Sequence, residues 1–515
     1  MPRFKHYDYD QLMMIPVSLE QQLMPGTLEY AIHRLIDERI DTTIFDEKYR
    51  NDEAGCTAYD PKVLLKIVLF AYSRGMLHSR PIERACKENV IFMALACGQK
   101  PDHSTLAAFV SSMGIDQVVS LFTQVLLVCE EEGLLGGTHF SLDGLKLSSN
   151  ASKEWSGKHD ELKKKQVKLQ EKVKEAVAEH READSGGGDP DGERRQQRIK
   201  RLKQKAERIE KFLSENEPKQ GKRGKEIQSN ITDNESAKMV TSHGVAQGYN
   251  ANAVVDEKTQ VVVHPQVFGD GEDSDHAAPM LKGTKENLET VGREDPLKDV
   301  TFTADTSYYS IENLEACKEH EVDAYIPDRD FRKRDPRFAD AQRHRRSVDK
   351  HKKRYKSKKR WFSPDDFTWD DRTKKLICPA GHALYKNGTK FETKDGYLAT
   401  SYRAPKRACT GCRLRSKCMR NPHGRSRQVR LFHGRRPGSI TDAMRAKIDT
   451  PQARRTYSKR LGIVEPVFGN IRAQKGMDEF TLRGRAKVNI QWTLYCLVHN
   501  IGKISNFGIN YAVAT

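Results

Sequence analysis

The order of strand-like and helix-like segments between residues 138 and 327 constrains the fold of this chain most strongly. The segment "THFSLDGLKLS" (138–148) places Phe140, Leu142 and Gly144 on one face and therefore predicts a strand. A long charged insert follows it. After this insert the patterns predict, in order, two strands, a helix, a strand, a helix and a strand. Strands that alternate with helices in this way are typical of an α/β fold.

The predicted order is that of a ribonuclease-H-like core that is interrupted twice. A helical-hairpin insert separates the first strand from the strand pair expected in "GYNANAVVDEKTQVVVHPQVFGD" (248–270). A basic, cysteine-bearing insert then separates the last of these strands from helices expected near 450–475 and 484–503. We therefore predict an α/β catalytic core, ribonuclease-H-like, that follows an all-α N-terminal domain.

The pattern divides the chain into six expected segments. They are a helical N-terminal domain for DNA binding or oligomerisation (1–130), the first core strand (131–150), a charged helical hairpin (151–230), the continued core (231–330), a basic insert (331–448) and C-terminal helices that complete the core (449–515). In the N-terminal domain, Asp60 and Pro61 predict the cap and first position of a helix. Periodicity alone does not decide between DNA binding and oligomerisation for this domain.

The charged insert carries two apolar stripes at helical spacing. The first comprises Leu162, Leu169, Val173 and Ala176, and the second comprises Ile199, Leu202, Ala206, Ile209 and Leu213. The second is a short heptad seam. Between the stripes, "DSGGGDPDGE" predicts a turn. The insert is thus expected to be a helical hairpin, which either helps to pair subunits or is simply a solvated, charged projection.

The formal net charge of +18 is concentrated in two segments. Residues 331–360 contain fifteen Lys or Arg and three Asp, and residues 401–440 contain twelve Lys or Arg and no acidic residue. Each segment thus carries +12, which leaves about −6 for the rest of the chain. Clustered Lys and Arg release counterions from a phosphate backbone, so a nucleic acid is the expected partner. A solvated loop is the alternative for either segment, and two such segments in one chain favour nucleic acid.

Four cysteines of the basic insert have spacing that suits a metal. "ICPAGH" and "ACTGCRLRSKC" supply Cys378, Cys409, Cys412 and Cys418, with His382 in reserve. This arrangement resembles an irregular zinc ribbon, in which the metal would have a structural role because four protein ligands leave no open position. The alternative is a set of reduced thiols without a ligand. The other six cysteines lie in apolar helical contexts and are expected to be buried thiols.

The sequence also bears on the cellular compartment. It contains no run of about 18 apolar residues, and its start, "MPRFKHYDYD", lacks the apolar centre of a signal peptide. Ten scattered cysteines do not resemble a secreted disulfide framework. A cytoplasmic protein without a membrane partner is therefore expected.

Three acidic residues occupy positions that the predicted core would bring together. Asp143 lies within the first strand, Asp305 follows the strand "TFTA", and Glu465 lies on a helix after the second insert. Phosphodiester chemistry by two metal ions needs such carboxylates to hold two Mg²⁺ (or Mn²⁺) ions about 3.5–4 Å apart. Taken singly, each residue is more simply a cap or a solvated side chain, and the three gain meaning from their joint placement.

At these residues the chain resembles a bacterial insertion-sequence transposase of the DDE class with an InsH-like N-terminal domain. "AYDPKVLLKIVLFAYSRGMLHSRPIERACKENVIFMALACGQKPDHSTLAAF" resembles that N-terminal domain. "FSLDGLKLSSNASK" and "FTADTSYYS" resemble the blocks around the two catalytic Asp residues, and "HGVAQGYNANAVVD" resembles the central hairpin. "YSKRLGIVEPVFGNIR" resembles the block around the catalytic Glu. The resemblance covers nearly the whole chain.

The resemblance implies roles for particular residues. Asp143, Asp305 and Glu465 would be the catalytic, metal-binding triad. A YREK-like signature would fall on Tyr457, Arg460, Glu465 and Arg472, and with Lys475 its basic members would contact DNA. The sequence departs from that signature at two points. Arg472 stands where the signature has a Lys, and four residues separate Arg460 from Glu465, one more than in the tightest form of the signature. Seven residues are nearly two helical turns, so Arg472 is expected on the same helix face as Glu465.

Other residues near the predicted site receive structural interpretations. Pro466 predicts a helix that begins at Glu465, after another helix that ends near Leu461 and Gly462. His264 is expected to be structural, since metal-bound water would supply the nucleophile. The competing carboxylates are expected to be turn or cap residues; they are Asp233, Asp270 and Asp275.

The function that the resemblance implies is DNA transposition. Such a transposase binds the terminal inverted repeats of its element, cleaves DNA strands and joins the freed 3′-hydroxyl to double-stranded target DNA. It is expected to work as a homodimer or higher oligomer and to be associated with the bacterial nucleoid. Two alternatives stay open: a catalytically inactive, transposase-derived repressor, and a ribonuclease-H-like nuclease that does not join strands.

Overall fold

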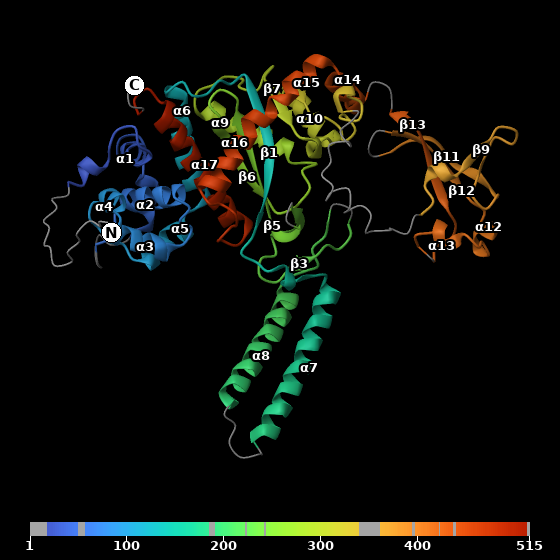
Figure 1. Cartoon of the computed structure of the whole chain (residues 1–515), viewed down its shortest axis with the longest axis horizontal. Coiled ribbons are helices and arrows are strands. Elements are labelled where there is room, and N and C mark those ends of the chain that lie inside the picture. The colour runs from blue at the N-terminus through green and yellow to red at the C-terminus, as the bar shows by residue number, and fades with distance from the viewer. Residues whose placement is uncertain are drawn as a thin grey trace, which may run out of the picture. The chain divides into compact units, whose positions relative to one another are not determined.

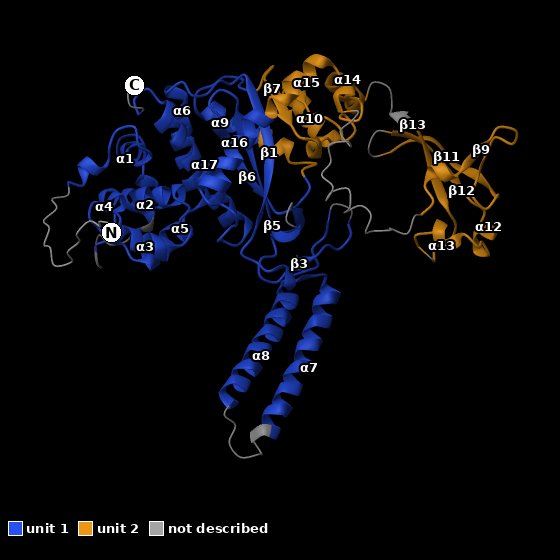
Figure 2. Cartoon of the chain, viewed as in Figure 1, with its two compact units in different colours: residues 1–272, 282–296, 461–515 blue, residues 273–281, 297–460 orange. Residues whose placement is uncertain are grey.

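The structure is a computed structural model, and Figure 1 shows it as a cartoon. It describes residues 18–49, 57–184, 191–221, 224–241, 244–338, 361–393, 397–421, 423–435 and 439–511. The chain divides into two compact units, coloured separately in Figure 2. Unit 1 comprises residues 1–272, 282–296 and 461–515, and unit 2 comprises residues 273–281 and 297–460.

Unit 1 begins with a helical region, as the sequence predicts. Its helices are η1 (Glu20–Gln22), α1 (Leu28–Glu38), η2 (Thr43–Lys48), α2 (Pro61–Ser73), α3 (Ser79–Glu88), α4 (Val90–Leu95), α5 (His103–Ser112) and α6 (Ile115–Glu131). The carboxylate of Asp60 caps α2 by accepting a hydrogen bond from the Lys62 amide at 2.7 Å, which confirms the predicted cap. Tyr72 of α2 stacks on Tyr495 of α17 (Arg485–Phe507), with ring centroids 4.9 Å apart.

Within the described ranges, no single helix is long and apolar enough to cross a membrane. Helices α5 and α6 are long and apolar enough only when they are taken together, and they are bent by 88° with respect to each other. Both helices contribute buried apolar side chains to the protein core, including Leu106, Phe109 and Phe122.

The strands of unit 1 form an antiparallel arrangement around β5 (Gly244–Asp256). This strand pairs with β1 (His139–Ser148), β4 (Ala237–Thr241) and β6 (Val262–Phe268). β5 is buried from Gln247 to Asp256, as expected for a strand with a neighbour on both edges. The predicted first strand and central hairpin are therefore confirmed.

The long helix α17 is held against these strands by buried hydrogen bonds. The indole Nε1 of Trp492 donates to the carbonyl of Asn252 at 2.9 Å. The amide of Asn500 both accepts from the backbone N–H of Val262 and donates to its carbonyl, each at 2.8 Å. Since an unpaired buried amide is costly, these bonds fix the position of α17 along the strands.

The charged insert is a helical hairpin, as predicted. α7 (His159–Asp184) and α8 (Gly192–Glu215) run side by side and project from the strands of unit 1 (Figure 1). Near the base, Leu162, Ile209 and Phe212 pack with Ile231, close to the two-residue strands β2 (Ser156–Gly157) and β3 (Ser229–Asn230). The apolar stripes therefore meet within the hairpin, and a role for the hairpin in pairing subunits stays a prediction.

Unit 2 contains the remaining strands and helices of the predicted core. β7 (Thr301–Ala304) and β8 (Asp323–Tyr325) are parallel and are connected by η4 (Thr306–Tyr308) and α10 (Ile311–Glu319). α14 (Ile440–Ile448) and α15 (Pro451–Ser458) complete this part, and the division between the two units falls within α9 (Ala277–Thr290). The buried guanidinium of Arg454 bridges Asp335 and Asp449, at 2.8 Å to each.

A second sheet in unit 2 carries the cysteine-bearing segment. Its strand order is β13 (Gln428–Arg435), β12 (Tyr397–Arg403), β11 (Ala383–Glu392), β10 (Lys375–Ile377) and β9 (Thr368–Asp370). The same part of the chain contains the short helices η6 (Pro364–Asp366), α12 (Lys406–Thr410) and α13 (Arg415–Cys418), and η5 (Pro336–Phe338) precedes it in the sequence. Most of the first basic segment, residues 339–360, lies outside the described residues.

The order of elements agrees with the sequence prediction from β1 through the hairpin insert, β5, β6, α9, β7, α10 and β8. A mixed α/β fold with a helical N-terminal region is therefore confirmed. The finer assignment to a ribonuclease-H-like fold stays a prediction.

Candidate active site

The first candidate ligand, Asp143, lies in the middle of β1. It pairs with Ala253 of the buried strand β5, and its side chain is half-buried. The backbone N–H of Gly144 donates to Asp143 Oδ1 at 2.9 Å. The hydrogen-bonded ladder between β1 and β5 holds the backbone of Asp143 in place, as a metal ligand needs.

The second candidate, Glu465, lies on α16 (Arg460–Gly469). Its neighbours Val464 and Val467 are 0% exposed, and Phe468 stacks on Trp492 of α17 with ring centroids 6.3 Å apart. This apolar stripe anchors the helix and leaves Glu465 on the exposed side. Among the described residues, no hydrogen bond or ion pair reaches the Glu465 carboxylate, so both of its oxygens are open to a ligand.

The predicted start of this helix at Glu465 is wrong. α16 begins at Arg460, and Pro466 lies inside it. A proline at position 466 removes the N–H that would bond to the carbonyl of Gly462. In the structure the side-chain Nε2 of Gln260 donates to that carbonyl at 2.9 Å. A distant residue thus satisfies the group that the proline leaves unpaired.

The chain after α16 widens into a π-helical turn, Asn470–Gln474, which contains Arg472. A π-turn changes the helical phase, so the expectation that Arg472 shares a face with Glu465 does not follow from α-helical spacing. The Arg472 guanidinium forms an ion pair with Asp478 at 3.0 Å and is 43% exposed. This surface pair is weak enough to open for a phosphate.

The third candidate ligand, Asp305, caps the short helix η4 directly after β7. Its Oδ1 accepts hydrogen bonds from the backbone N–H and the hydroxyl of Ser307, the former at 2.7 Å. Its Oδ2 receives no hydrogen bond from any residue that the structure describes. One carboxylate oxygen is thereby held in place while the other is available.

Two residues of the YREK-like signature lie close to Asp305 in unit 2. Burial raises the pKa of the Tyr457 phenol, while the Arg460 guanidinium, which is hydrogen-bonded to it, lowers this pKa and Asp305 raises it. Arg460 is only 7% exposed, and Phe331 packs edge-on against Tyr457 with centroids 5.4 Å apart. The tyrosine, the arginine and the carboxylate therefore form one electrostatically linked group.

The structure places Asp143 and Glu465 in unit 1 and Asp305 in unit 2. Their convergence on one pair of metal ions therefore remains a prediction. Within the described part of the chain, the potential ligand atoms that lie within 4.8 Å of one another belong to Asp270, Asp275 and His276, between β6 and α9. Exposed acidic groups often gather without a metal, and these three residues were not predicted as ligands.

His264 behaves as the sequence interpretation expects. Its ring lies directly against Gly283, and its Nδ1 is 3.2 Å from the side-chain amide of Asn287. Burial lowers the pKa of His264 to about 4, so the ring is neutral near pH 7. A neutral, enclosed imidazole packs the strand β6 against α9.

Lys475, an expected DNA contact, is instead largely enclosed. It is 7% exposed, and burial, reinforced by the charge of Lys503, lowers its pKa to about 8. The unfolded chain keeps this proton up to about 10.5. The cost of burying the charge is therefore full below pH 8 and declines as the pH rises towards 10.5.

We expect Lys475→Met to raise the free energy of unfolding at pH 7 by about 1–3 kcal/mol, because it removes a poorly solvated charge at similar volume. This gain should shrink between pH 8 and pH 10, as measured by urea unfolding at several pH values. Equal stability of the two proteins at pH 7 would contradict the assignment. DNA affinity of the same variant tests the sequence-based expectation of a phosphate contact.

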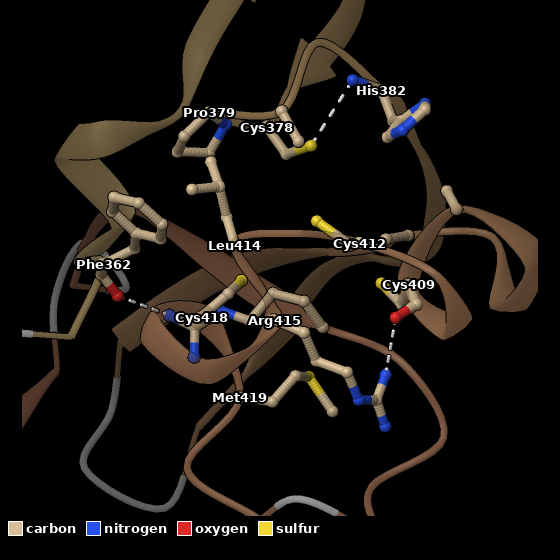
Figure 3. Close-up of a pocket in the computed structure, with 14 residues that line it drawn as sticks. Phe362, Cys378, Pro379, His382, Cys409, Cys412, Leu414, Arg415, Cys418 and Met419 are labelled. Carbon is tan, nitrogen blue, oxygen red and sulfur yellow. Dashed lines mark hydrogen bonds between the residues drawn. The ribbon is translucent and has the colours of Figure 1, made fainter.

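The four predicted zinc ligands line one small cavity in the second sheet's module, and Figure 3 shows them. Cys378 follows β10, Cys409 lies in α12, Cys412 follows it, and Cys418 ends α13. Burial raises the pKa of the Cys418 thiol, and Arg427 lowers it.

Two family comparisons bear on this arrangement. Residues 377–505 match the family described as Transposase DDE domain, and residues 17–112 match the family described as Transposase domain (DUF772). The resemblance to insertion-sequence DDE transposases is thereby confirmed. The comparison with curated proteins gives no match.

The two matches cover only some of the predicted site residues of this chain. The DDE-domain match contains Glu465, Tyr457, Arg460 and Arg472, together with the four cysteines, whereas Asp143 and Asp305 lie outside both matches. The N-terminal match covers α1 to α5. DDE transposases generally use divalent metal ions, and the donors available on β1, η4 and α16 are carboxylate oxygens, which Mg²⁺ and Mn²⁺ prefer.

Proposed function

We propose that this chain catalyses DNA transposition by metal-dependent strand cleavage and strand transfer. The observation that carries the proposal is the exposed carboxylate of Glu465, which has no protein partner in the described structure and lies within the DDE-domain match. An acidic side chain that has no protein partner and lies next to the buried apolar stripe of its helix is available to bind a ligand. A glutamate with a purely structural role would more often cap a helix or form an ion pair.

Asp143, Asp305 and Glu465 would hold the metal ions. When bound, two Mg²⁺ or Mn²⁺ ions supply an activated water or 3′-hydroxyl and stabilise the leaving oxygen. The rigidity of Asp143 on β1 and the Ser307 bonds to Asp305 would keep two of the ligands in fixed positions. The exposed Glu465 would complete the site once α16 is docked against α17.

The basic side chains near these acids would orient the DNA. Arg460 would neutralise charge on the scissile or flanking phosphate, and Tyr457, held by Phe331, would position the strand. Arg472 would give up its ion pair with Asp478 and bind a DNA phosphate instead. Recognition of the element ends would fall to the N-terminal helices, and two DNA ends call for a dimer or higher oligomer.

A strand-transfer assay tests the proposal. Purified protein is incubated with Mg²⁺, a supercoiled target plasmid and a labelled duplex that carries the DNA flanking the chain's own gene. Labelled end joined covalently to plasmid supports transposition. Cleavage without joining would support the nuclease alternative, and binding without either would support the inactive repressor.

A further inference from the structure

The cavity lined by the four cysteines has the size and donors of a single metal site. Figure 3 shows the sulfur atoms of Cys378, Cys409, Cys412 and Cys418 arranged around one space. The cavity measures about 20 Å³, enough for one small ion or water. Four sulfur donors around a space of this size suit Zn²⁺ better than a hard cation.

Backbone geometry at Cys378 supports a sulfur that carries negative charge. The N–H of His382 donates to Cys378 Sγ at 3.4 Å, and the N–H of Gly381 donates to the Cys378 carbonyl at 2.8 Å. Gly381 makes this tight turn with φ of 80°, a conformation that favours glycine. Amide donors aimed at sulfur stabilise a metal-bound thiolate more than a neutral thiol.

Two arginines that line the cavity supply the compensating charge. The Nε of Arg427 is buried and has no hydrogen-bond partner in the described structure, although its guanidinium donates to the Phe362 carbonyl at 2.9 Å. Arg415 donates to the carbonyls of Cys409 and Gly424, each at 2.8 Å. A tetrathiolate zinc centre carries a net charge of −2, which these two cations would balance.

We propose that Cys378, Cys409, Cys412 and Cys418 bind one structural Zn²⁺ ion. Tetrahedral Zn–S bonds of about 2.3 Å require sulfurs about 3.8 Å apart. In the described residues these sulfurs do not form a group within 4.8 Å, so binding includes a small inward movement of α12, α13 and the β10–β11 turn. The four thiols release their protons as the bonds form.

The module has a structural need for such a metal. Its buried core is small, consisting of Phe367, Leu376, Leu384, Tyr402, Ala404, Cys409 and Val429. Cys378 and Cys418 pack against that core. Small cores commonly rely on a metal or disulfide for stability.

Metal analysis of the full-length protein tests the site. We expect about one zinc per chain, a Co²⁺-substituted form with the visible absorption of tetrahedral cobalt thiolate, and loss of the metal in Cys412→Ser. Cys97→Ser is the matched control, since Cys97 is distant in sequence from the module and is exposed, so the expectation that it is a buried thiol is wrong. Cys412→His should keep the zinc, because histidine also ligates it. Purified protein without zinc that also fails to take up Co²⁺, or a Cys412→Ser protein that keeps its zinc, would overturn the proposal.

The opposite face of the same sheet carries an independent feature, an exposed group of aromatic and basic side chains. Paired residues of an antiparallel ladder share a face. The ladder pairs Tyr385 with Arg403, and it pairs Ala399 with both Phe391 and Phe432. These residues therefore lie on one face of the sheet, and the buried Tyr402 and Val429 lie on the other. Tyr385 is 50% exposed and Phe432 is 57% exposed.

Cations lie directly over or beside these rings. The guanidinium of Arg430 lies 5.6 Å from the centre of the Phe391 ring, and Arg430 pairs with Ser401 on the same face. Tyr397 packs edge-on against Phe432 at 5.8 Å. Exposed rings offer surfaces on which bases stack, and arginines beside them match the phosphates of the same strand. Duplex DNA hides its base faces, whereas an unpaired strand offers both.

We propose that this face of β11, β12 and β13 binds an unpaired DNA strand. This proposal rests on the proposed function, in which DNA is the partner. It assigns one face of the sheet to a DNA strand that has been separated from its complement by opening or cutting of the duplex. Charge favours this occupant, since residues 401–440 contain twelve Lys or Arg and no acidic residue.

Fluorescence anisotropy with a single-stranded and a duplex oligonucleotide tests the assignment on the full chain. The double variant Tyr385→Ala with Phe432→Ala should bind the single strand at least about tenfold more weakly and bind the duplex unchanged. Trp369→Ala is the control, because Trp369 is 42% exposed but packs against Tyr402 on the other face. Unchanged single-strand affinity in the double variant would overturn this assignment, whereas absence of all DNA binding by the unmodified chain would count against the proposed function.

Discussion

Glu465→Gln is expected to lower the rates of DNA cleavage and joining by about 10²- to 10⁴-fold while leaving DNA binding intact. The substitution keeps the size and exposure of the side chain but removes the charge that a divalent ion needs. A metal ligand contributes several kcal/mol of charge stabilisation in the transition state, and each 1.36 kcal/mol corresponds to a tenfold change in rate.

The fold of the Glu465→Gln protein should be unchanged, because the carboxylate forms no hydrogen bond or ion pair with a described residue. Glu479→Gln is the matched control, since Glu479 is an exposed acid of the same region outside the signature. The test compares the joining rates of the two variants and the unmodified protein, measured with the labelled DNA end and Mg²⁺. Undiminished joining by Glu465→Gln would remove this residue from the catalytic site.

Trp492→Ala should lower the free energy of unfolding of unit 1 by about 3–5 kcal/mol. Trp492 is 0% exposed, stacks on Phe468 of α16 and donates to the carbonyl of Asn252 in β5. Truncation leaves a large cavity, removes the indole hydrogen bond to that carbonyl and takes away the ring on which Phe468 of α16 stacks.

Trp492→Phe separates these effects. It keeps an aromatic ring against Phe468 but removes the indole donor and part of the ring volume, so a smaller loss of about 1–3 kcal/mol is expected. Urea unfolding followed by circular dichroism measures both variants. A loss below about 1 kcal/mol for Trp492→Ala would show that α16 does not depend on this contact.

The order of strands and helices could be read from the sequence because it depends on local periodicity. Apolar and polar residues alternate in 138–148 because a single strand buries one face there. The apolar stripes of the hairpin insert arise because each helix buries one face. The pairing of β1 with β5 then follows, since both strands bury apolar residues on the shared sheet.

The start of α16 could not be read in the same way. Pro466 normally marks a first helical turn, and the local sequence gives no other signal. The hydrogen bond that allows it inside the helix comes from Gln260, which is 202 residues away. His499 and Lys503 of α17 in turn hold Gln260, at 2.9 and 3.0 Å. Only the folded chain brings this support together.

The electrostatic surroundings of the site residues also depend on tertiary structure. The resemblance to DDE transposases implies that Arg472 and Lys475 contact DNA. It does not reveal that a π-turn intervenes, that Asp478 pairs with Arg472, or that Lys475 is buried. Conversely, Tyr457 and Asp305 are far apart in sequence and yet electrostatically linked in unit 2.

We propose that Asp305 and Glu465 act in one catalytic centre. A double-mutant cycle of joining rates with Asp305→Asn, Glu465→Gln and the combined variant tests it most directly, with strand transfer in Mg²⁺ as the readout. Because residues that act as one unit are strongly non-additive, the account predicts that the double variant is about as inactive as either single variant. Losses that multiply, or a single variant that joins DNA at the original rate, would contradict a shared site.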